Sequence, residues 1–333
     1  MKKLISIVVS VCVLIFAFQA TVFANEFTDL ENDHDYYVAI TYLTRIGVLN
    51  GYSDGSFRPD NTINRAEALK VIFVGSDVDS SDASRDDIFY DVPADAWYKS
   101  YVNKGYELEI VKGDGVDGGF HGERDVNKAE FLKMLLEANE IEDSALAGAV
   151  STTANDVPVD AWFVPYLNYA VLIGVTELNS QGGLGPDKAL TRGEVSKMLY
   201  LLMLVKGEDN TQLLLDAAEL EMIQIDAYVG VGKIDKAKEA SELAVDLTQQ
   251  AMENAPGDDV ILGIAKLAKA YDYLVQSFLL GAQGNYVGAE KWANDAIDKA
   301  EEAWETDNDT EIVSKYIKEV ARSILRQVGG VEY

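Results

Sequence analysis

Three basic residues stand at the same distance from a glutamate in three separate stretches of the chain. Arg65, Lys128 and Arg192 are each followed two residues later by Glu, and each comes eight residues after an apolar residue of a glycine-containing loop. The helix dipole disfavours a cation in the first turn of a helix unless that cation contacts an anion. Guanidinium groups bind carboxylates and phosphates through paired hydrogen bonds, and a helix N-terminus adds further N–H groups. The pattern therefore predicts anion binding at these positions.

A structural role is the alternative for the same residues. Arg65 is close in sequence to Glu67 and Asp60, and it can also pair with a carboxylate of a neighbouring copy. Ion pairs of this kind are common on acidic surfaces and contribute little to stability. Lys128 lacks the planar fork of arginine and suits paired recognition of an anion less well.

The elements around these residues repeat as a unit. Asn64 has the features of a helix N-cap, with Glu67 three residues later and an apolar run behind it. Upstream of each such helix lie a glycine-rich loop, an aromatic-rich helix and, before that, an aspartate. These aspartates are Asp29, Asp91 and Asp156, so the unit recurs about every 62 to 65 residues. One such helix pair cannot bury its own apolar stripe, so the three copies should fold together.

This pattern resembles the S-layer homology domain, the three-repeat module that attaches bacterial surface proteins to cell envelopes. Copy one has the best loop, Gly51–Pro59, while copies two and three carry Trp97 and Trp162 in the aromatic position of the family, where copy one has Asp35. The resemblance implies an all-α fold in which the second helices form a central three-helix bundle around a pseudo-threefold axis. It also implies binding to an acidic secondary cell-wall polysaccharide, often one that bears pyruvate ketals.

The predicted polysaccharide-binding residues come from all three copies. A flat indole ring suits the C–H face of a pyranose, although Trp97 is equally compatible with a place in the core. The predicted ligand-binding residues are Asp54, Gly55, Arg65, Trp97, Lys128, Trp162 and Arg192.

The N-terminus predicts export. Residues 1–24 have two lysines, an apolar run and then small residues, as in a cleaved signal peptide. A retained membrane anchor is the alternative, but the apolar run is short for a membrane span. Cys12, the only cysteine, lies in this segment, so the mature chain has no thiol chemistry. We therefore expect a secreted protein of the cell wall or cell surface, or of the periplasm or outer membrane in a diderm, with no transmembrane segment after cleavage.

The predicted domains follow from the repeats and from a change in character near Gly207. The repeats are predicted at 27–75, 88–138 and 155–206, and a separate helical domain at 207–333. The polar stretch Ser76–Asp87 is a linker or, less in keeping with its ligand spacing, a calcium-binding segment. The loop Gly113–Gly119 is predicted to be a recognition loop.

The last 127 residues predict five helices separated by turn signals. They weakly resemble tetratricopeptide repeats, but the offset between similar segments differs from the usual period, and an isolated bundle fits as well. We expect this domain to bind a protein partner of unknown identity. The predicted helices are Thr211–Val229, Lys233–Asn254, Asp259–Gln283, Tyr286–Thr306 and Thr310–Gln327.

Composition argues against several other functions. The net charge of −28 disfavours nucleic-acid binding. Two histidines and no cysteine after cleavage leave no zinc site of the usual spacing, and neither a nucleophile elbow nor a phosphate loop is present. We expect no enzyme activity, no cofactor and no metal. The predicted function is non-covalent anchoring to a wall polysaccharide; the alternative is an assembly adaptor whose repeats are only a scaffold.

Overall fold

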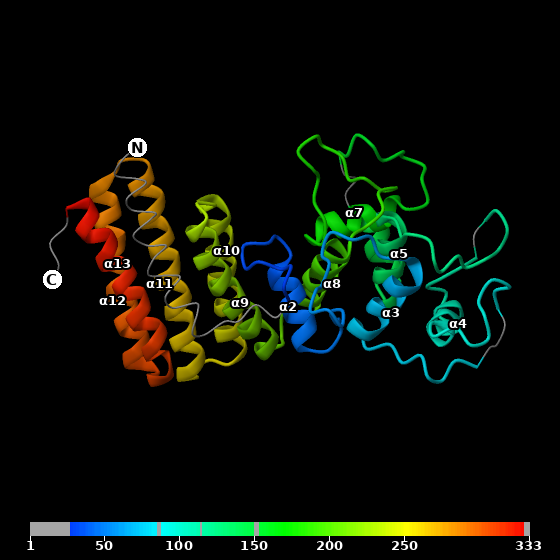
Figure 1. The fold of residues 1–333 in the computed structure, drawn as a ribbon, viewed down its shortest axis with the longest axis horizontal. Helices are drawn as coiled ribbons and strands as arrows, with labels where there is room; N and C mark the ends of the chain where they lie inside the picture. Colours follow the sequence, from blue (N-terminus) through cyan, green and yellow to red (C-terminus); the bar gives the residue numbers. More distant parts are fainter. Residues whose placement is uncertain (1–26, 85–87, 114, 150–152, 330–333) are drawn as a thin grey trace. The chain divides into compact units, whose positions relative to one another are not determined.

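The computed structural model describes residues 27–84, 88–113, 115–149 and 153–329, and these parts are all-α, as predicted (Figure 1). The predicted signal peptide and Cys12 lie outside the described residues. The described residues divide into two compact units, one within 39–205 and the other formed by 27–38 with 206–329. Among the described residues, no helix combines the length and hydrophobicity that a membrane crossing needs.

The repeat region alternates short first helices with longer second helices. The second helices begin at Arg65, Lys128 and Arg192, as predicted, and α3 packs against α5. The bounds are α2 (Tyr37–Arg45), α3 (Arg65–Gly75), α4 (Lys99–Glu107), α5 (Lys128–Ala138), α6 (Asp143–Gly148), α7 (Val164–Leu172) and α8 (Arg192–Lys206).

Reciprocal capping explains why the second helices start where they do. The Asn64 side chain accepts a hydrogen bond from the Glu67 N–H at 2.8 Å, and the Glu67 carboxylate accepts one from the Asn64 N–H at 3.2 Å. Asn127 and Glu130 form the same box at the start of α5. Each box satisfies two backbone donors that a helix start otherwise leaves open. The predicted N-cap role of Asn64 is therefore confirmed.

Helix α6 was not predicted. It occupies the stretch between copies two and three, where one apolar side chain, Leu146, is buried. A six-residue helix has too little periodicity to show in a sequence, because nucleation is costly and tertiary contacts stabilise such short helices.

The three copies are joined by a closed ring of backbone hydrogen bonds. The Ile63 N–H donates to the Leu190 carbonyl at 3.1 Å, the Val126 N–H donates to the Ile63 carbonyl at 3.1 Å, and the Leu190 N–H donates to the Val126 carbonyl at 3.0 Å. All three side chains are buried. Since each copy satisfies its donor only on another copy, the three copies cannot complete their hydrogen bonding separately.

The C-terminal unit contains five long helices whose ends lie within one residue of the predicted bounds. Each packs on the next along the chain, and α9 and α13 both contact α11 (Figure 1). Buried alanines line one face of α10 and of α12, which allows neighbouring helices to approach closely. The helices are α9 (Thr211–Gly230), α10 (Ile234–Asn254), α11 (Asp259–Ala282), α12 (Tyr286–Thr306) and α13 (Glu311–Val328), with a 3₁₀ turn at Asn308–Thr310.

The first described residues of the chain belong to this same compact unit. Gln224 donates to the carbonyl of His34 at 2.8 Å, and Lys233 lies 2.7 Å from the Asp33 carboxylate. Asp35 forms an ion pair with Lys236. Asp35, which stands in copy one where the other copies have Trp97 and Trp162, therefore contacts a lysine of the helical unit.

One carboxylate of the helical unit is held among helices by tyrosines. Asp226 accepts hydrogen bonds from the Tyr271 and Tyr316 hydroxyls, each at 3.1 Å. These residues lie on α9, α11 and α13. Burial raises the pKa of Asp226 to about 7, although the two hydroxyls stabilise its charged form.

The raised pKa of Asp226 predicts that stability depends on pH. A folded-state pKa above the unfolded value means that the stabilising contribution is complete below about pH 4 and is lost as pH rises through about 7. Part of the Asp226 surface remains accessible to solvent. We therefore expect the free energy of unfolding to fall by on the order of 3 kcal/mol, which is less than the free energy that corresponds to the whole pKa shift. Urea unfolding of wild type and Asp226→Asn at pH 4 and pH 8 measures it: the advantage of the Asn variant should grow with pH.

Asp298→Asn is the matched control, because Asp298 is exposed on α12. We expect its effect on the free energy of unfolding to be small. Equal pH dependence in the Asp226 and Asp298 variants would contradict the prediction.

Candidate ligand-binding site

The start of each second helix is bonded to the loop of another copy. The first backbone N–H of the helix donates to a loop carbonyl at 2.9 to 3.1 Å, and the pairs are Arg65 to Arg124, Lys128 to Lys188, and Arg192 to Asn61. The next N–H donates to the same loop, and the third donates to the side chain of the residue before the helix, which is Asn64, Asn127 or Thr191. These helix starts therefore do not offer the free N–H groups that we expected for an anion, because neighbouring loops already occupy them.

The side chain of Arg192, like its backbone N–H, bonds to a loop of another copy. Arg192 donates from Nε to the Phe57 carbonyl and from Nη2 to the Asn50 carbonyl, both at 3.0 Å. Its guanidinium lies 4.5 Å from the centre of the Phe57 ring. Arg192 thus holds the loop of copy one. Burial lowers the pKa of Lys128, while the charge of Glu194 opposes this effect.

Arg65 and Trp162, two of the predicted residues, meet at one cavity of about 300 Å³. Arg65 comes from copy one and Trp162 from copy three, while the loop of copy two supplies much of the remaining wall. More than half of the Trp162 surface is exposed. The residues that line the cavity are Arg65, Ile110, Lys112, Gly113, Gly115, Phe120, Arg124, Glu130, Lys133, Met134 and Trp162.

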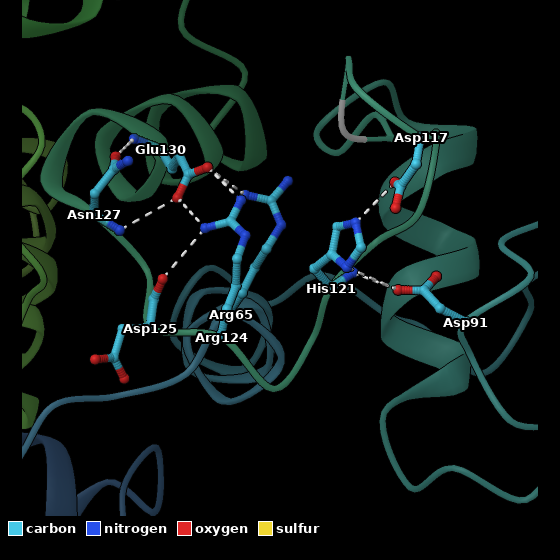
Figure 2. A network of polar contacts seen from close by, with 8 residues as sticks. All are labelled: Arg65, Asp91, Asp117, His121, Arg124, Asp125, Asn127 and Glu130. Carbon is cyan, nitrogen blue, oxygen red and sulfur yellow. Dashed lines mark hydrogen bonds and ion pairs between the residues drawn. The ribbon is translucent and has the colours of Figure 1, made fainter.

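Glu130 connects two arginines at the wall of this cavity (Figure 2). Its carboxylate accepts hydrogen bonds from Arg124 Nη1 at 2.8 Å and Nη2 at 2.5 Å, and it lies 3.4 Å from Arg65 Nη1. Burial alone would raise the pKa of Glu130, but the Arg124 hydrogen bonds and the Arg65 charge outweigh it and keep the pKa below its usual range. The pairing of Arg65 with a carboxylate of a neighbouring copy, which we held as an alternative, is therefore present.

The repeating aspartates hold the glycine-rich loops, a role that the sequence analysis missed. Asp91 accepts hydrogen bonds from the N–H groups of Phe120 at 2.8 Å and His121 at 2.6 Å. Asp156 accepts the same pair from Leu184 at 2.8 Å and Gly185 at 2.7 Å. Recurrence of the aspartate was the available signal, but its partners lie almost thirty residues away and no local pattern identifies them.

Asp117 is a further loop carboxylate, and it bonds to groups close to it. The Asp117 carboxylate accepts hydrogen bonds from the Gly119 N–H at 2.9 Å and from the Tyr90 hydroxyl at 2.8 Å. It also pairs with His121, as Figure 2 shows. These contacts lower the pKa of Asp117 to about 2, and the hydrogen bond from Gly119 contributes most. The contacts of Asp117 therefore hold the second half of the loop between Gly113 and Gly119 in place.

Asp54 and Gly55, predicted to bind ligand, organise the loop of copy one. The Asp54 carboxylate accepts from the Ser56 N–H at 3.0 Å and from Arg58 Nη2 at 2.8 Å. Gly55 has φ +81°, a conformation that favours glycine. Contact of either residue with a ligand remains a prediction.

Trp97 lies on the surface and not in the core. Its exposed fraction is 55%, close to the 56% of Trp162. The Lys70 ammonium lies 5.8 Å from the centre of its ring. The core alternative for Trp97 is therefore wrong, and its flat face remains accessible.

The hydrogen bonds to Asp91 predict that one substitution at this position lowers the stability of the protein. Asp91→Asn removes the charge that accepts two N–H groups, and we expect a loss of about 1–3 kcal/mol in the free energy of unfolding at pH 7. Since the folded pKa of Asp91 is lowered, this contribution should be complete above the ordinary aspartate pKa and should be lost as the pH falls below it toward the lowered folded pKa. Urea unfolding at pH 7 and pH 3 measures both parts.

Asp95→Asn, at an exposed carboxylate of the same segment, is the control and should change little. A neutral effect of Asp91→Asn at pH 7 would show that its hydrogen bonds are not needed for the loop.

Comparison with known proteins supports the resemblance. The S-layer homology domain profile matches residues 26–69 and 88–132. The Surface-layer 125 kDa protein of Lysinibacillus sphaericus is 32% identical over 46% of this chain and 13% of its own length. The S-layer protein EA1 of Bacillus anthracis is 27% identical over 71% of this chain and 25% of its own length, and a Cell surface protein of Thermoanaerobacter kivui is 31% identical over 43% and 19%.

The chain spans a quarter or less of these three relatives, and the profile does not reach the predicted third repeat or the helical unit. The matches support the predicted location at the cell surface or cell wall. Over the two matched stretches the chain is similar to the S-layer homology domain, and over part of its length it is similar to S-layer and cell-surface proteins.

Proposed function

We propose that this chain is an exported cell-envelope protein that its repeats, residues 27–206, anchor non-covalently to an acidic secondary cell-wall polysaccharide. The observation that carries the proposal is the cavity at which Arg65 and Trp162 meet. The profile match supports it, because it covers the copy that supplies Arg65 and the copy whose loop forms the wall.

The cavity combines the two chemistries that an acidic sugar requires. The exposed face of Trp162 suits the C–H face of a pyranose, and the Arg65 guanidinium suits a carboxylate such as that of a pyruvate ketal. Arg65 is oriented by Glu130 and lies 5.2 Å from the centre of the Phe120 ring. A held guanidinium loses less conformational freedom when it binds.

The surroundings of the other predicted ligand-binding residues suit an acidic sugar less well than the Arg65 cavity does. Arg192 already holds two carbonyls of the copy-one loop, and Lys128 is largely desolvated. Trp97 presents an exposed ring. We propose that residues 155–206 are a third repeat and that these positions add weaker contacts, which together raise the avidity for a repeating polymer.

For residues 207–333 we propose a surface for a protein partner. Val287 and Ile312 are exposed at the starts of α12 and α13. A tetratricopeptide-like array and an isolated bundle both remain compatible with the consecutive packing of α9–α13. An assembly adaptor with scaffold repeats is the competing proposal, and the experiment below separates the two.

We predict that substitutions at the cavity weaken binding to the cell wall. Trp162→Ala should reduce the affinity of the full mature chain for purified walls of its source organism by about tenfold, because it removes the stacking face. Arg65→Ala should reduce it at least as much. Co-sedimentation with walls before and after chemical removal of the secondary polysaccharide measures both variants.

Leu172→Ala is the control, since Leu172 is a similarly exposed apolar residue on α7 of the same copy. Its binding should equal that of wild type. If Trp162→Ala and Arg65→Ala both pellet like wild type, or if wild type pellets equally without the polysaccharide, the anchor proposal fails and the adaptor alternative gains support.

A further inference from the structure

The exposed indole ring of Trp162 packs against two aromatic rings of its own copy. The centres of the Trp162 and Phe163 rings are 5.4 Å apart at an interplanar angle of 82°, and those of the Trp162 and Tyr166 rings are 6.5 Å apart at 64°. Both arrangements are edge-to-face, a geometry that aromatic pairs prefer. The indole therefore has neighbours that restrict its rotamer, although more than half of its surface stays exposed.

Tyr166 is itself held by a hydrogen bond to another copy. Its hydroxyl donates to the Glu137 carboxylate at 2.5 Å. Tyr166 lies in the first turn of α7 and Glu137 near the end of α5, and these two helices pack together. Burial and this hydrogen bond raise the pKa of Tyr166, so the hydroxyl stays protonated and can donate at neutral pH. A hydrogen bond to a charged acceptor is one of the stronger kinds, and it fixes the Tyr166 ring relative to copy two.

The acceptor Glu137 is in turn held from the cavity side. Its carboxylate lies 3.7 Å from the ammonium of Lys133, one turn earlier on α5. The same ammonium donates to the Ile110 carbonyl at 3.1 Å and lies 5.9 Å from the centre of the Tyr166 ring. Both Lys133 and Ile110 line the cavity. A continuous set of contacts therefore runs from the cavity wall to the ring that supports Trp162.

The repeats allow this support to be compared between copies. Tyr166 comes four residues after Trp162, and Tyr101 comes four residues after Trp97. Helix α4, which contains Tyr101, packs on α3 as α7 packs on α5. The two exposed tryptophans therefore have a tyrosine at the same position, each facing the second helix of the preceding copy.

The second helices differ at the residue that meets this tyrosine. Glu137 is the tenth residue of α5, and the tenth residue of α3 is Val74, whose side chain has no hydrogen-bond acceptor. The Tyr101 ring packs edge-on against Phe73, with the ring centres 6.1 Å apart. The tenth residue of α8 is Leu201, which has no acceptor either. Of the three second helices, α5 is thus the one that offers a carboxylate at this position.

Resting on the proposed function, we propose that Tyr166 and Glu137 are positioning residues that hold Trp162 in the orientation in which it stacks on a sugar ring. A ring whose rotamer is already restricted loses less conformational freedom when a ligand binds, so the same stacking contact gives a higher affinity. Trp97 is as exposed as Trp162 but lacks this support. The Arg65 cavity is therefore the principal sugar site, and the surface around Trp97 is a weaker one.

The test uses the full mature chain and soluble polysaccharide released from walls of its source organism. Tyr166→Phe removes only the hydroxyl and should weaken binding about fivefold, the order of the cost of immobilising one more side chain on binding. Tyr101→Phe is the matched control beside Trp97 and should change the affinity by less than about twofold. Isothermal titration at neutral pH measures the affinities, and urea unfolding verifies that each variant is folded.

A double-mutant cycle and a conservative variant separate positioning from a general effect on packing. In the Trp162→Ala background, Tyr166→Phe should weaken binding no further, because the ring that it positions is gone. Glu137→Gln keeps an oxygen that accepts the hydroxyl and should retain most of the affinity. Glu137→Val, which reproduces the residue of α3, should weaken binding as much as Tyr166→Phe does.

Three results would overturn this inference and leave the anchor proposal intact. They are unchanged binding of Tyr166→Phe while Trp162→Ala still weakens binding, an equal loss from Tyr166→Phe with and without the Trp162 ring, and a Glu137→Gln variant as weak as Glu137→Val. If Trp162→Ala and Arg65→Ala both bind like wild type, the anchor proposal itself is refuted, and this inference with it.

Discussion

The repeat region depends on hydrogen bonds that each copy can complete only on another copy. Ile63, Val126 and Leu190 donate and accept around a closed ring, and the first N–H of each second helix donates into a neighbouring loop. Unpaired backbone donors in a buried setting are costly, so a separate copy would leave several groups unsatisfied. The three copies are therefore one cooperative structure, and the cavity exists only when all three are in place.

This dependence explains how the site is built. Arg65 begins a helix of copy one, its orienting carboxylate Glu130 belongs to copy two, and Trp162 stands in copy three. The aspartates that hold the loops act before any ligand does, because Asp91 and Asp156 each satisfy two consecutive loop N–H groups. Several of the charged residues in the repeats therefore serve structure first, and the ligand chemistry uses side chains that this structure has already oriented.

The helical unit is held together differently. Its helices pack through faces of small residues, with Ala293, Ala296 and Ala300 fully buried on α12. Within this apolar interior Asp226 joins three helices through Tyr271 and Tyr316. A carboxylate with hydroxyl partners and a raised pKa makes this junction sensitive to pH, whereas the lowered pKa values of Asp91 and Glu130 make the repeat region sensitive in the opposite direction.

Caps, turn residues and apolar periodicity act within a few residues, so the sequence predicted the all-α class, the starts of the second helices and the five C-terminal helices. It also singled out Arg65 and Trp162, through spacing that recurs between copies. The three-dimensional structure was needed to show that Arg65 meets Glu130, that Arg192 holds a loop and that Trp97 is exposed. It also revealed Lys112, Arg124 and Lys133 as cavity residues and the short helix α6. The physical reason is the same in each case: partners that lie tens of residues apart are brought together by packing between copies, and no local preference of the chain encodes such a meeting.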